Sequence, residues 1–150
     1  FGPDKVHCIM LPYRYTSEAS LKDAKDCAER LGVRYDVVSI GDPVDEALKE
    51  LGPIFGGRPV DTAEENIQSR MRGVVLMAVS NKLGSMLLTT GNKSEMGVGY
   101  ATIYGDMNGG YNPLKDMFKM EVYALADWRN KNMPGDCLGP SGMVIPRELR

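Results

Sequence analysis

The sequence predicts an α/β domain built around a parallel sheet, and two patterns carry that prediction. Short apolar runs, typical of buried strands, alternate with stretches whose apolar residues recur every three or four positions, as on one face of a helix. The first strand, helix and second strand follow one another through short connections over residues 5–40. Strand–helix–strand units of this kind form parallel sheets. The chain has 150 residues and 43% hydrophobic content, which is sufficient for one domain with its own core.

The first predicted unit runs from a buried strand at 5–11 to a second strand at 33–40. Between them, Thr16 and Ser17 are both candidate N-caps of a helix, and Gly32 stands where a left-handed residue commonly ends one. The helix is amphipathic, with an apolar face formed by Leu21, Ala24, Ala28 and Leu31.

The middle of the chain predicts two helices and a third strand. A short helix at 44–51 is followed by a loop at 52–60, which is rich in glycine and proline. Thr62 and Glu65 match the capping-box pattern at the start of a long helix. The apolar run within 85–89 predicts the third strand.

The last third of the chain predicts one helix between irregular segments. Residues 97–110 are rich in glycine and small side chains, which suits a loop or short helix that approaches a ligand closely. A helix is predicted to follow Pro113 and to run to about Asn130, and residues 133–146 are predicted to be irregular. The residues expected on the inward face of that helix are Phe118, Val122, Leu125 and Trp128.

Composition and charge exclude several classes of protein. The 18 basic and 20 acidic residues leave a formal net charge of −2, which excludes a strongly basic nucleic-acid binder. No apolar run approaches the roughly 18 residues of a membrane span, and the first residues lack the pattern of a signal peptide. We therefore expect neither nucleic acid nor a membrane among the partners.

The cysteines and the single histidine favour structural roles. Cys8, Cys27 and Cys137 are an odd number without CxxC spacing, which disfavours a disulfide framework or a zinc site and favours the reduced thiols of a cytoplasmic protein. His7 lies inside an apolar run, and we interpret it as a hydrogen-bonded strand residue rather than a catalytic base.

Polar residues follow the third predicted strand at its carboxyl end, where open α/β sheets bind ligands. Thr89, Thr90 and Gly91 offer hydroxyls and accessible backbone for a nucleotide phosphate or sugar, or they form a turn that needs small polar residues. Glu95 either helps to hold Mg²⁺, which prefers carboxylates together with phosphate oxygens, or is a solvated residue at a helix start.

Asp106 and the pair Lys115 and Lys119 also allow a ligand-binding and a purely structural interpretation. Asp106 either contacts a ligand hydroxyl or a bound metal, or forms an Asx-turn. Lys115 and Lys119 are four residues apart on the predicted helix. Either both lie on a solvated face, or one of their ammonium groups reaches a phosphate. Asn66 and Arg70 are one helical turn apart and project together. Because neither glycine-rich phosphate-binding template is present, these residues predict a strand-end site and leave its ligand open.

Five segments together resemble one family, the NAD synthetases, and in particular the synthetase domain of the glutamine-dependent type. The resemblance covers about residues 2–146, and its most specific block is Leu88–Met107. It implies a doubly wound parallel sheet of the adenine nucleotide α-hydrolase, or ATP pyrophosphatase, type. The segments that carry it are 11–18, 62–73, 88–102, 104–107 and 126–130.

The resemblance implies an enzyme, a glutamine-dependent carbon–nitrogen ligase. In this family, ATP adenylates the carboxylate of deamido-NAD and releases pyrophosphate. Ammonia then displaces AMP to give NAD, and an amidase domain elsewhere in the parent chain supplies that ammonia from glutamine. Magnesium acts beside ATP, and members are homo-oligomers of the cytoplasm.

The resemblance also implies roles for individual residues. By matching position, ATP binding is expected of Thr90 and Lys119, metal binding of Glu95, and deamido-NAD binding of Asn66, Arg70, Glu95 and Asp106. Glu95 and Asp106 are the expected catalytic residues.

One departure limits what the chain is expected to do. The family's Ser-Gly-Gly-x-Asp-Ser pyrophosphate loop, which follows its first strand, is absent from these 150 residues. We therefore expect residues 1–150 to be most of one synthetase domain, incomplete at both ends, without the amidase domain and inactive alone, with 146–150 as a truncated or joined end. A non-catalytic nucleotide-binding fragment and a different ATP pyrophosphatase ligase, similar to GMP synthetase, stay open as alternatives.

Overall fold

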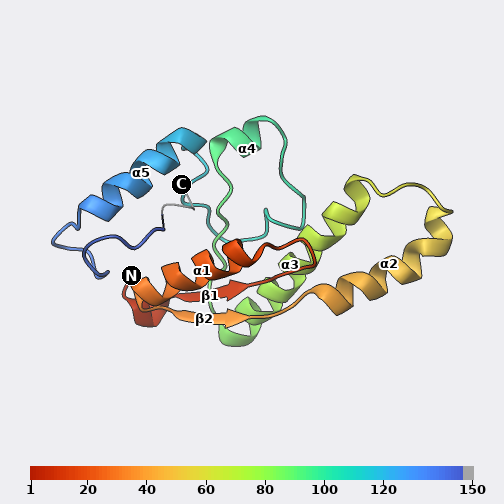
Figure 1. Cartoon of the computed structure of the whole chain (residues 1–150), viewed down its shortest axis with the longest axis horizontal. Helices are drawn as coiled ribbons and strands as arrows, with labels where there is room; N and C mark the ends of the chain where they lie inside the picture. Colours follow the sequence, from red (N-terminus) through yellow and green to blue (C-terminus); the bar gives the residue numbers. More distant parts are fainter. Residues whose placement is uncertain (147–150) are drawn as a thin grey trace. The chain divides into compact units, whose positions relative to one another are not determined.

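The computed structural model describes residues 1–146, which form two compact units (Figure 1). One unit contains residues 1–38 and the chain from residue 120 onward, and the other contains residues 39–119. Most of the truncated or joined end predicted at 146–150 lies outside the described residues. Within residues 1–146, no helix is long and apolar enough to cross a membrane.

The first unit is built on the predicted strand–helix–strand arrangement, which is confirmed. After a short 3-10 helix, η1 (Pro3–Lys5), strand β1 (His7–Met10) pairs in parallel with strand β2 (Arg34–Val37). Helix α1 (Glu18–Leu31) connects them and contacts both (Figure 1). The sheet register opposes the first residue of β1 to the first of β2 and the last to the last.

Both ends of α1 follow from their sequence. Ser17 is the N-cap, and its hydroxyl accepts the N–H of Ser20 at 3.1 Å. The other candidate, Thr16, instead accepts the N–H of Tyr13 at 3.0 Å and closes the preceding turn. Gly32 ends the helix with φ 68°, a left-handed conformation that suits glycine, as predicted.

Helix α5 (Lys119–Lys131) corrects the start of the helix predicted to follow Pro113. The helix begins later because the side chain of Asn112 accepts the N–H of Leu114 at 3.1 Å and holds the chain in a turn. Lys115 and Lys119 therefore do not share a helix. The predicted inward face is also wrong for Phe118, Leu125 and Trp128, which are about half exposed.

Two helices of the second unit contact each other, α2 (Gly41–Phe55) and α3 (Thr62–Leu83). Helix α2 is longer than the predicted 44–51 and continues through Pro53, so the loop predicted from residue 52 is shorter. The capping box of α3 uses Asp61 and Glu64, one residue before the predicted pair. Both registers fit the sequence, and Asp is at least as good an N-cap as Thr.

The predicted third strand at 85–89 is reduced to one isolated parallel bridge between Leu88 and Tyr111. After this bridge the chain turns into the short helix α4 (Lys93–Gly97). Residues 98–118 lack helices and strands apart from the bridge at Tyr111, which agrees with the loop predicted at 97–110.

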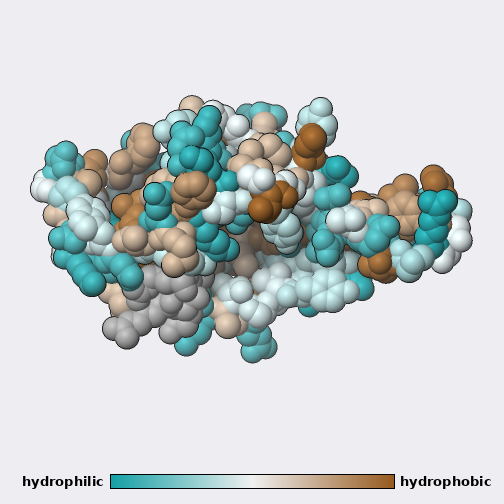
Figure 2. Space-filling model, turned by 90° about the horizontal axis from the view of Figure 1, so that it is seen from above, coloured by the Kyte–Doolittle hydropathy of each residue, from teal (hydrophilic) through white to brown (hydrophobic). Residues whose placement is uncertain are grey.

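Large apolar side chains of the second unit are exposed. Ile54 on α2, Val74 on α3 and Val98 after α4 have 78%, 62% and 81% of their surface accessible. Figure 2 shows such hydrophobic side chains (brown) open to solvent among hydrophilic ones.

Candidate functional site

A pocket of about 590 Å³ lies within the second unit and contains the candidate acidic residues. Its wall comes from the turn after the Leu88 bridge, from α4 and from the irregular chain between residues 100 and 116. Glu95, Asp106 and Asp116 contribute carboxylates, and Lys115 contributes an ammonium group. A pocket of this size is in the range that holds a small ligand or part of a nucleotide.

Glu95 is held by a reciprocal capping box at the start of α4. The side chain of Asn92 accepts the N–H of Glu95 at 3.1 Å, and Oε2 of Glu95 accepts the N–H of Asn92 at 3.0 Å. Asn92 is buried, whereas Glu95 is partly exposed and lines the pocket. The predicted position of Glu95 at a helix start is therefore confirmed, and the same residue lines the pocket.

The turn that contains Thr90 is held in place by a segment about 20 residues later in the chain. Thr89 donates its N–H to the carbonyl of Tyr111 at 3.0 Å, and the side-chain amide of Asn112 donates to the carbonyl of Gly91 at 2.9 Å. Gly109 lies so close that an added Cβ would be 3.0 Å from the carbonyl oxygen of Leu87. These contacts fix the backbone on both sides of Thr90, and Thr90 itself is exposed.

Asp106 is positioned by α3. Its N–H donates to the hydroxyl of Ser69 at 3.0 Å, and its carboxylate accepts the N–H of Thr102 at 2.6 Å. Gly105 is buried against α3, where an added Cβ would lie 3.0 Å from the backbone carbon of Ser69. The preceding residue, Tyr104, has a left-handed backbone with φ 62°.

Asn66 and Arg70 do project together from α3, and both contact the segment that carries Asp106. The amide oxygen of Asn66 accepts the hydroxyl of Thr102 at 2.9 Å, and Nε of Arg70 donates to the carbonyl of Ile103 at 3.2 Å.

The structure brings only some of the predicted residues to the pocket. Glu95 and Asp106 line the pocket directly. The other predicted site residues do not contribute to its wall; they are Asn66, Arg70, Thr90 and Lys119. Lys119 is exposed, and its backbone N–H donates to the hydroxyl of Ser94 at 3.1 Å. Within residues 1–146, no group of three or more histidine, cysteine, aspartate or glutamate residues is arranged to hold a metal ion.

Sequence reasoning missed Asn112, which connects the two sides of the pocket. Its oxygen and nitrogen each have a backbone partner, Leu114 and Gly91 respectively. The Asn-Pro dipeptide at 112–113 is a turn signal that could have indicated the first contact. The second joins residues 21 positions apart and has no local pattern.

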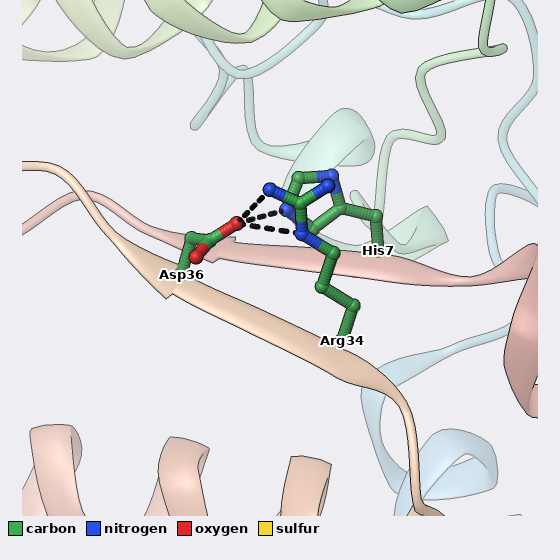
Figure 3. A network of polar contacts seen from close by, with 3 residues as sticks. All are labelled: His7, Arg34 and Asp36. Atoms are coloured by element: carbon green, nitrogen blue, oxygen red, sulfur yellow. Dashed lines mark hydrogen bonds and ion pairs between the residues drawn. The ribbon is translucent and has the colours of Figure 1, made fainter.

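The first unit holds a separate polar cluster, which Figure 3 shows on the two paired strands. Nε2 of His7 lies 2.8 Å from Oδ2 of Asp36, and Nε of Arg34 donates to the same oxygen at 2.9 Å. These contacts, from His7 first and then Arg34, lower the pKa of Asp36 below its ordinary value. His7 is thus a hydrogen-bonded strand residue, as interpreted from the sequence.

The three cysteines are free thiols. Cys8 in β1 and Cys27 in α1 are partly buried, and burial raises the pKa of each thiol. Cys137 is exposed.

Comparison with known proteins relates the chain to one family. The family model described as NAD synthase matches residues 1–148. The glutamine-dependent NAD(+) synthetase of Rhodobacter capsulatus is 56% identical over 145 residues, which are 97% of this chain and 26% of that protein. The chain therefore spans about a quarter of the length of such relatives.

Solved structures agree with that relationship. The glutamine-dependent NAD+ synthetase of Acinetobacter baumannii, in complex with ADP, matches with a TM-score of 0.88 and 44% identity, covering 95% of this chain and 26% of that one. An NH3-dependent NAD synthetase of Campylobacter jejuni matches with a TM-score of 0.73 and 30% identity, covering 81% and 51%. These neighbours confirm the α/β fold class of the adenine nucleotide α-hydrolase type.

Proposed function

The chain belongs to the NAD synthase family, and from this premise we propose that its parent protein amidates deamido-NAD to NAD with ATP and glutamine-derived ammonia. The relatives that it matches carry the name glutamine-dependent NAD(+) synthetase. Residues 1–150 are proposed to be most of the synthetase domain, with the first strand, the pyrophosphate loop and the amidase domain outside them. The observation that carries the proposal is the pocket lined by Glu95 and Asp106, within the family's most specific sequence block.

The chemistry needs an activated carboxylate. A carboxylate cannot lose oxide, so an oxygen of the nicotinate carboxylate attacks the α-phosphorus of ATP, and pyrophosphate leaves. Ammonia then attacks the acyl carbon of this mixed anhydride, AMP leaves with the bridging oxygen, and the one excess proton of ammonia passes to water. We propose that Thr90 and Lys119 contact ATP in the first step.

Deamido-NAD is proposed to bind beside α3 through Asn66 and Arg70. Arg70 is exposed and uses Nε for the carbonyl of Ile103, while its terminal nitrogens have no hydrogen-bond partner among residues 1–146. A guanidinium group in this state can pair with both oxygens of a carboxylate. Asp106 is proposed to lie next to the substrate, because it lines the pocket.

Magnesium is proposed to bind at Glu95. Mg²⁺ typically takes one or two carboxylates and completes its coordination with water and substrate phosphates. The carboxylate of Glu95 at the pocket wall fits that demand. When bound, the ion would spread negative charge on the phosphates of ATP.

A homo-oligomer in the cytoplasm is also proposed. The exposed apolar residues of α2 and α3 would be covered by a second copy, and the three free thiols agree with a reducing compartment. Light scattering of the purified parent protein measures its mass, and a monomer at micromolar concentration would contradict the oligomer.

The experiment for the function uses the full-length parent protein with deamido-NAD, Mg-ATP and either glutamine or ammonium. We expect NAD, AMP and pyrophosphate in equal amounts from wild type. No NAD from wild type with either nitrogen source would contradict the function.

Two variants test Glu95. Glu95→Gln keeps an oxygen that can accept the N–H of Asn92 but removes the charge, whereas Glu95→Ala removes both. A metal-binding or catalytic role predicts a loss of kcat of about 100-fold or more in both. Wild-type activity in Glu95→Gln would contradict a metal-binding or catalytic role and leave Glu95 only its role in the capping box of α4. Glu64→Gln is the matched control, because Glu64 has the same capping role on α3 and does not line the pocket.

A further inference from the structure

Two short segments of the second unit run side by side through three contacts. The N–H of Lys93 donates to the carbonyl of Met117 at 2.8 Å, and the N–H of Lys119 donates to the hydroxyl of Ser94 at 3.1 Å. The ammonium group of Lys93 also lies 4.8 Å from the centre of the Phe118 ring. Because consecutive residues take part on both sides, the contacts set the register between the segments.

Among these contacts, the hydroxyl of Ser94 is the group that accepts the N–H of Lys119. Lys119 is the first residue of α5, and its N–H belongs to the group of helix N–H donors that lack a partner within the helix. The hydroxyl of Ser94 supplies that partner from a distant part of the chain. Ser94 also directly precedes Glu95, so one residue joins the proposed metal carboxylate to the backbone of the proposed ATP-binding lysine.

The connection matters because the chain between Glu95 and Lys119 is mostly irregular. A lysine side chain is long and flexible, so its reach depends on where its backbone is anchored. Without the Ser94 hydrogen bond, the start of α5 would lose a fixed point relative to the pocket wall.

We propose that Ser94 is a positioning residue for ATP: its hydroxyl anchors Lys119 so that the ammonium group meets the phosphates. This inference rests on the function and on the role of Lys119 proposed above. It predicts that Ser94 sets the affinity for ATP through Lys119 and has little effect on deamido-NAD.

The test uses the full-length parent protein with Ser94→Ala, Ser94→Thr, Lys119→Ala and the double variant Ser94→Ala/Lys119→Ala. Calorimetry measures binding of α,β-methylene-ATP with Mg²⁺, and kinetics measure KM for both substrates. Loss of one hydrogen bond predicts about 3- to 10-fold weaker nucleotide binding in Ser94→Ala. Ser94→Thr, which keeps the hydroxyl, should bind within about twofold of wild type. KM for deamido-NAD should be unchanged.

The double variant decides whether Ser94 acts through Lys119. We expect Ser94→Ala to cause no further loss of nucleotide binding when Lys119 is already alanine. An undiminished loss in that background, wild-type binding by Ser94→Ala, or an equal rise in both KM values would each overturn the inference. Ser39→Ala is the matched control, since the hydroxyl of Ser39 accepts the N–H of Gly41 at 3.1 Å, at the first residue of α2.

Failure of the function can be told apart from failure of this inference. A wild-type protein that binds the ATP analogue but makes no NAD contradicts the function, and the binding data still judge Ser94. Unchanged nucleotide binding by Lys119→Ala overturns both the assigned role of Lys119 and the inference. Thermal unfolding of each variant identifies any that fails to fold, and if Ser94→Ala does so, clearly weaker nucleotide binding by a folded Ser94→Thr, which keeps the hydroxyl, overturns the inference.

Discussion

The hydroxyl of Thr102 donates a 2.9 Å hydrogen bond to the amide oxygen of Asn66, 36 residues earlier in the chain. The backbone N–H of the same threonine donates to the carboxylate of Asp106 at 2.6 Å. Thr102 therefore connects two of the residues proposed to bind deamido-NAD, one on α3 and one at the pocket.

Replacing Thr102 with valine is expected to impair deamido-NAD binding. The variant keeps the branched shape but loses the hydroxyl, leaving the amide oxygen of Asn66 without this donor. Loss of one such bond predicts a rise of about 3- to 10-fold in KM for deamido-NAD with KM for ATP unchanged. Thr102→Ser is the control, because it keeps the hydroxyl. Equal behaviour of the serine and valine variants would contradict the importance of this bond.

Gly73→Ala is expected to weaken the packing of the Tyr104–Asn108 segment on α3. Gly73 is buried, and an added Cβ would lie 2.9 Å from the carbonyl oxygen of Tyr104 and closer still to the side chain of Asn108. Overpacking of this kind typically costs about 1–3 kcal/mol, measured as the free energy of unfolding in urea. Gly135→Ala, with open space around the added methyl group, should differ little from wild type. Equal stability of the two variants would be inconsistent with the tight contact.

The contribution of Asp36 to stability is expected to disappear in acid. Because its contacts with His7 and Arg34 lower its pKa in the folded protein, the stabilisation is fully present above the ordinary value of 3.8. It is lost as the pH falls through the lower folded value. The difference in Tm between wild type and Asp36→Asn should therefore shrink as the pH falls below about 3.8.

Asp136→Asn provides the control for this pH series, because Asp136 is an exposed carboxylate outside the strands. Its Tm difference from wild type should stay small throughout. A difference for Asp36→Asn that persists or grows below pH 3.8 would be incompatible with a lowered pKa.

The cysteines are expected to react with iodoacetamide at different rates. Burial raises the pKa values of Cys8 and Cys27, so less thiolate is present at a given pH, and both thiols are less accessible than that of Cys137. Peptide mass spectrometry at pH 7.5 should find Cys137 modified about tenfold faster. In urea the three rates should converge. Native labelling of Cys8 as fast as that of Cys137 would show that β1 is not protected.

Local patterns predicted the elements whose determinants are local. The apolar face of α1 and the glycine that ends it follow directly from residue spacing. The start of α5 was missed because Pro113 suits the first turn of a helix, while the Asn112 side chain captures the N–H of Leu114 instead. The strand at 85–89 was overpredicted, since its described partner is a single residue, Tyr111, in a segment without strand periodicity.

The site divides in the same way. Glu95 and Asp106 were reachable because they lie in one specific block of sequence, and both line the pocket. The contact of Asp106 with Ser69 was not, because it joins residues 37 positions apart. Tertiary hydrogen bonds of this kind leave no periodic trace in a single sequence.

The reciprocal capping box of α4 links the backbone N–H of Asn92 to a carboxylate that lines the pocket. A ligand that binds Oε2 of Glu95 shares this oxygen with the N–H of Asn92, a buried residue that donates to it. Occupancy of the pocket and fraying of the first turn of α4 are then linked. The rate at which the Asn92 amide exchanges its hydrogen with solvent would change as the carboxylate changes partner, so the backbone records an event at a side chain.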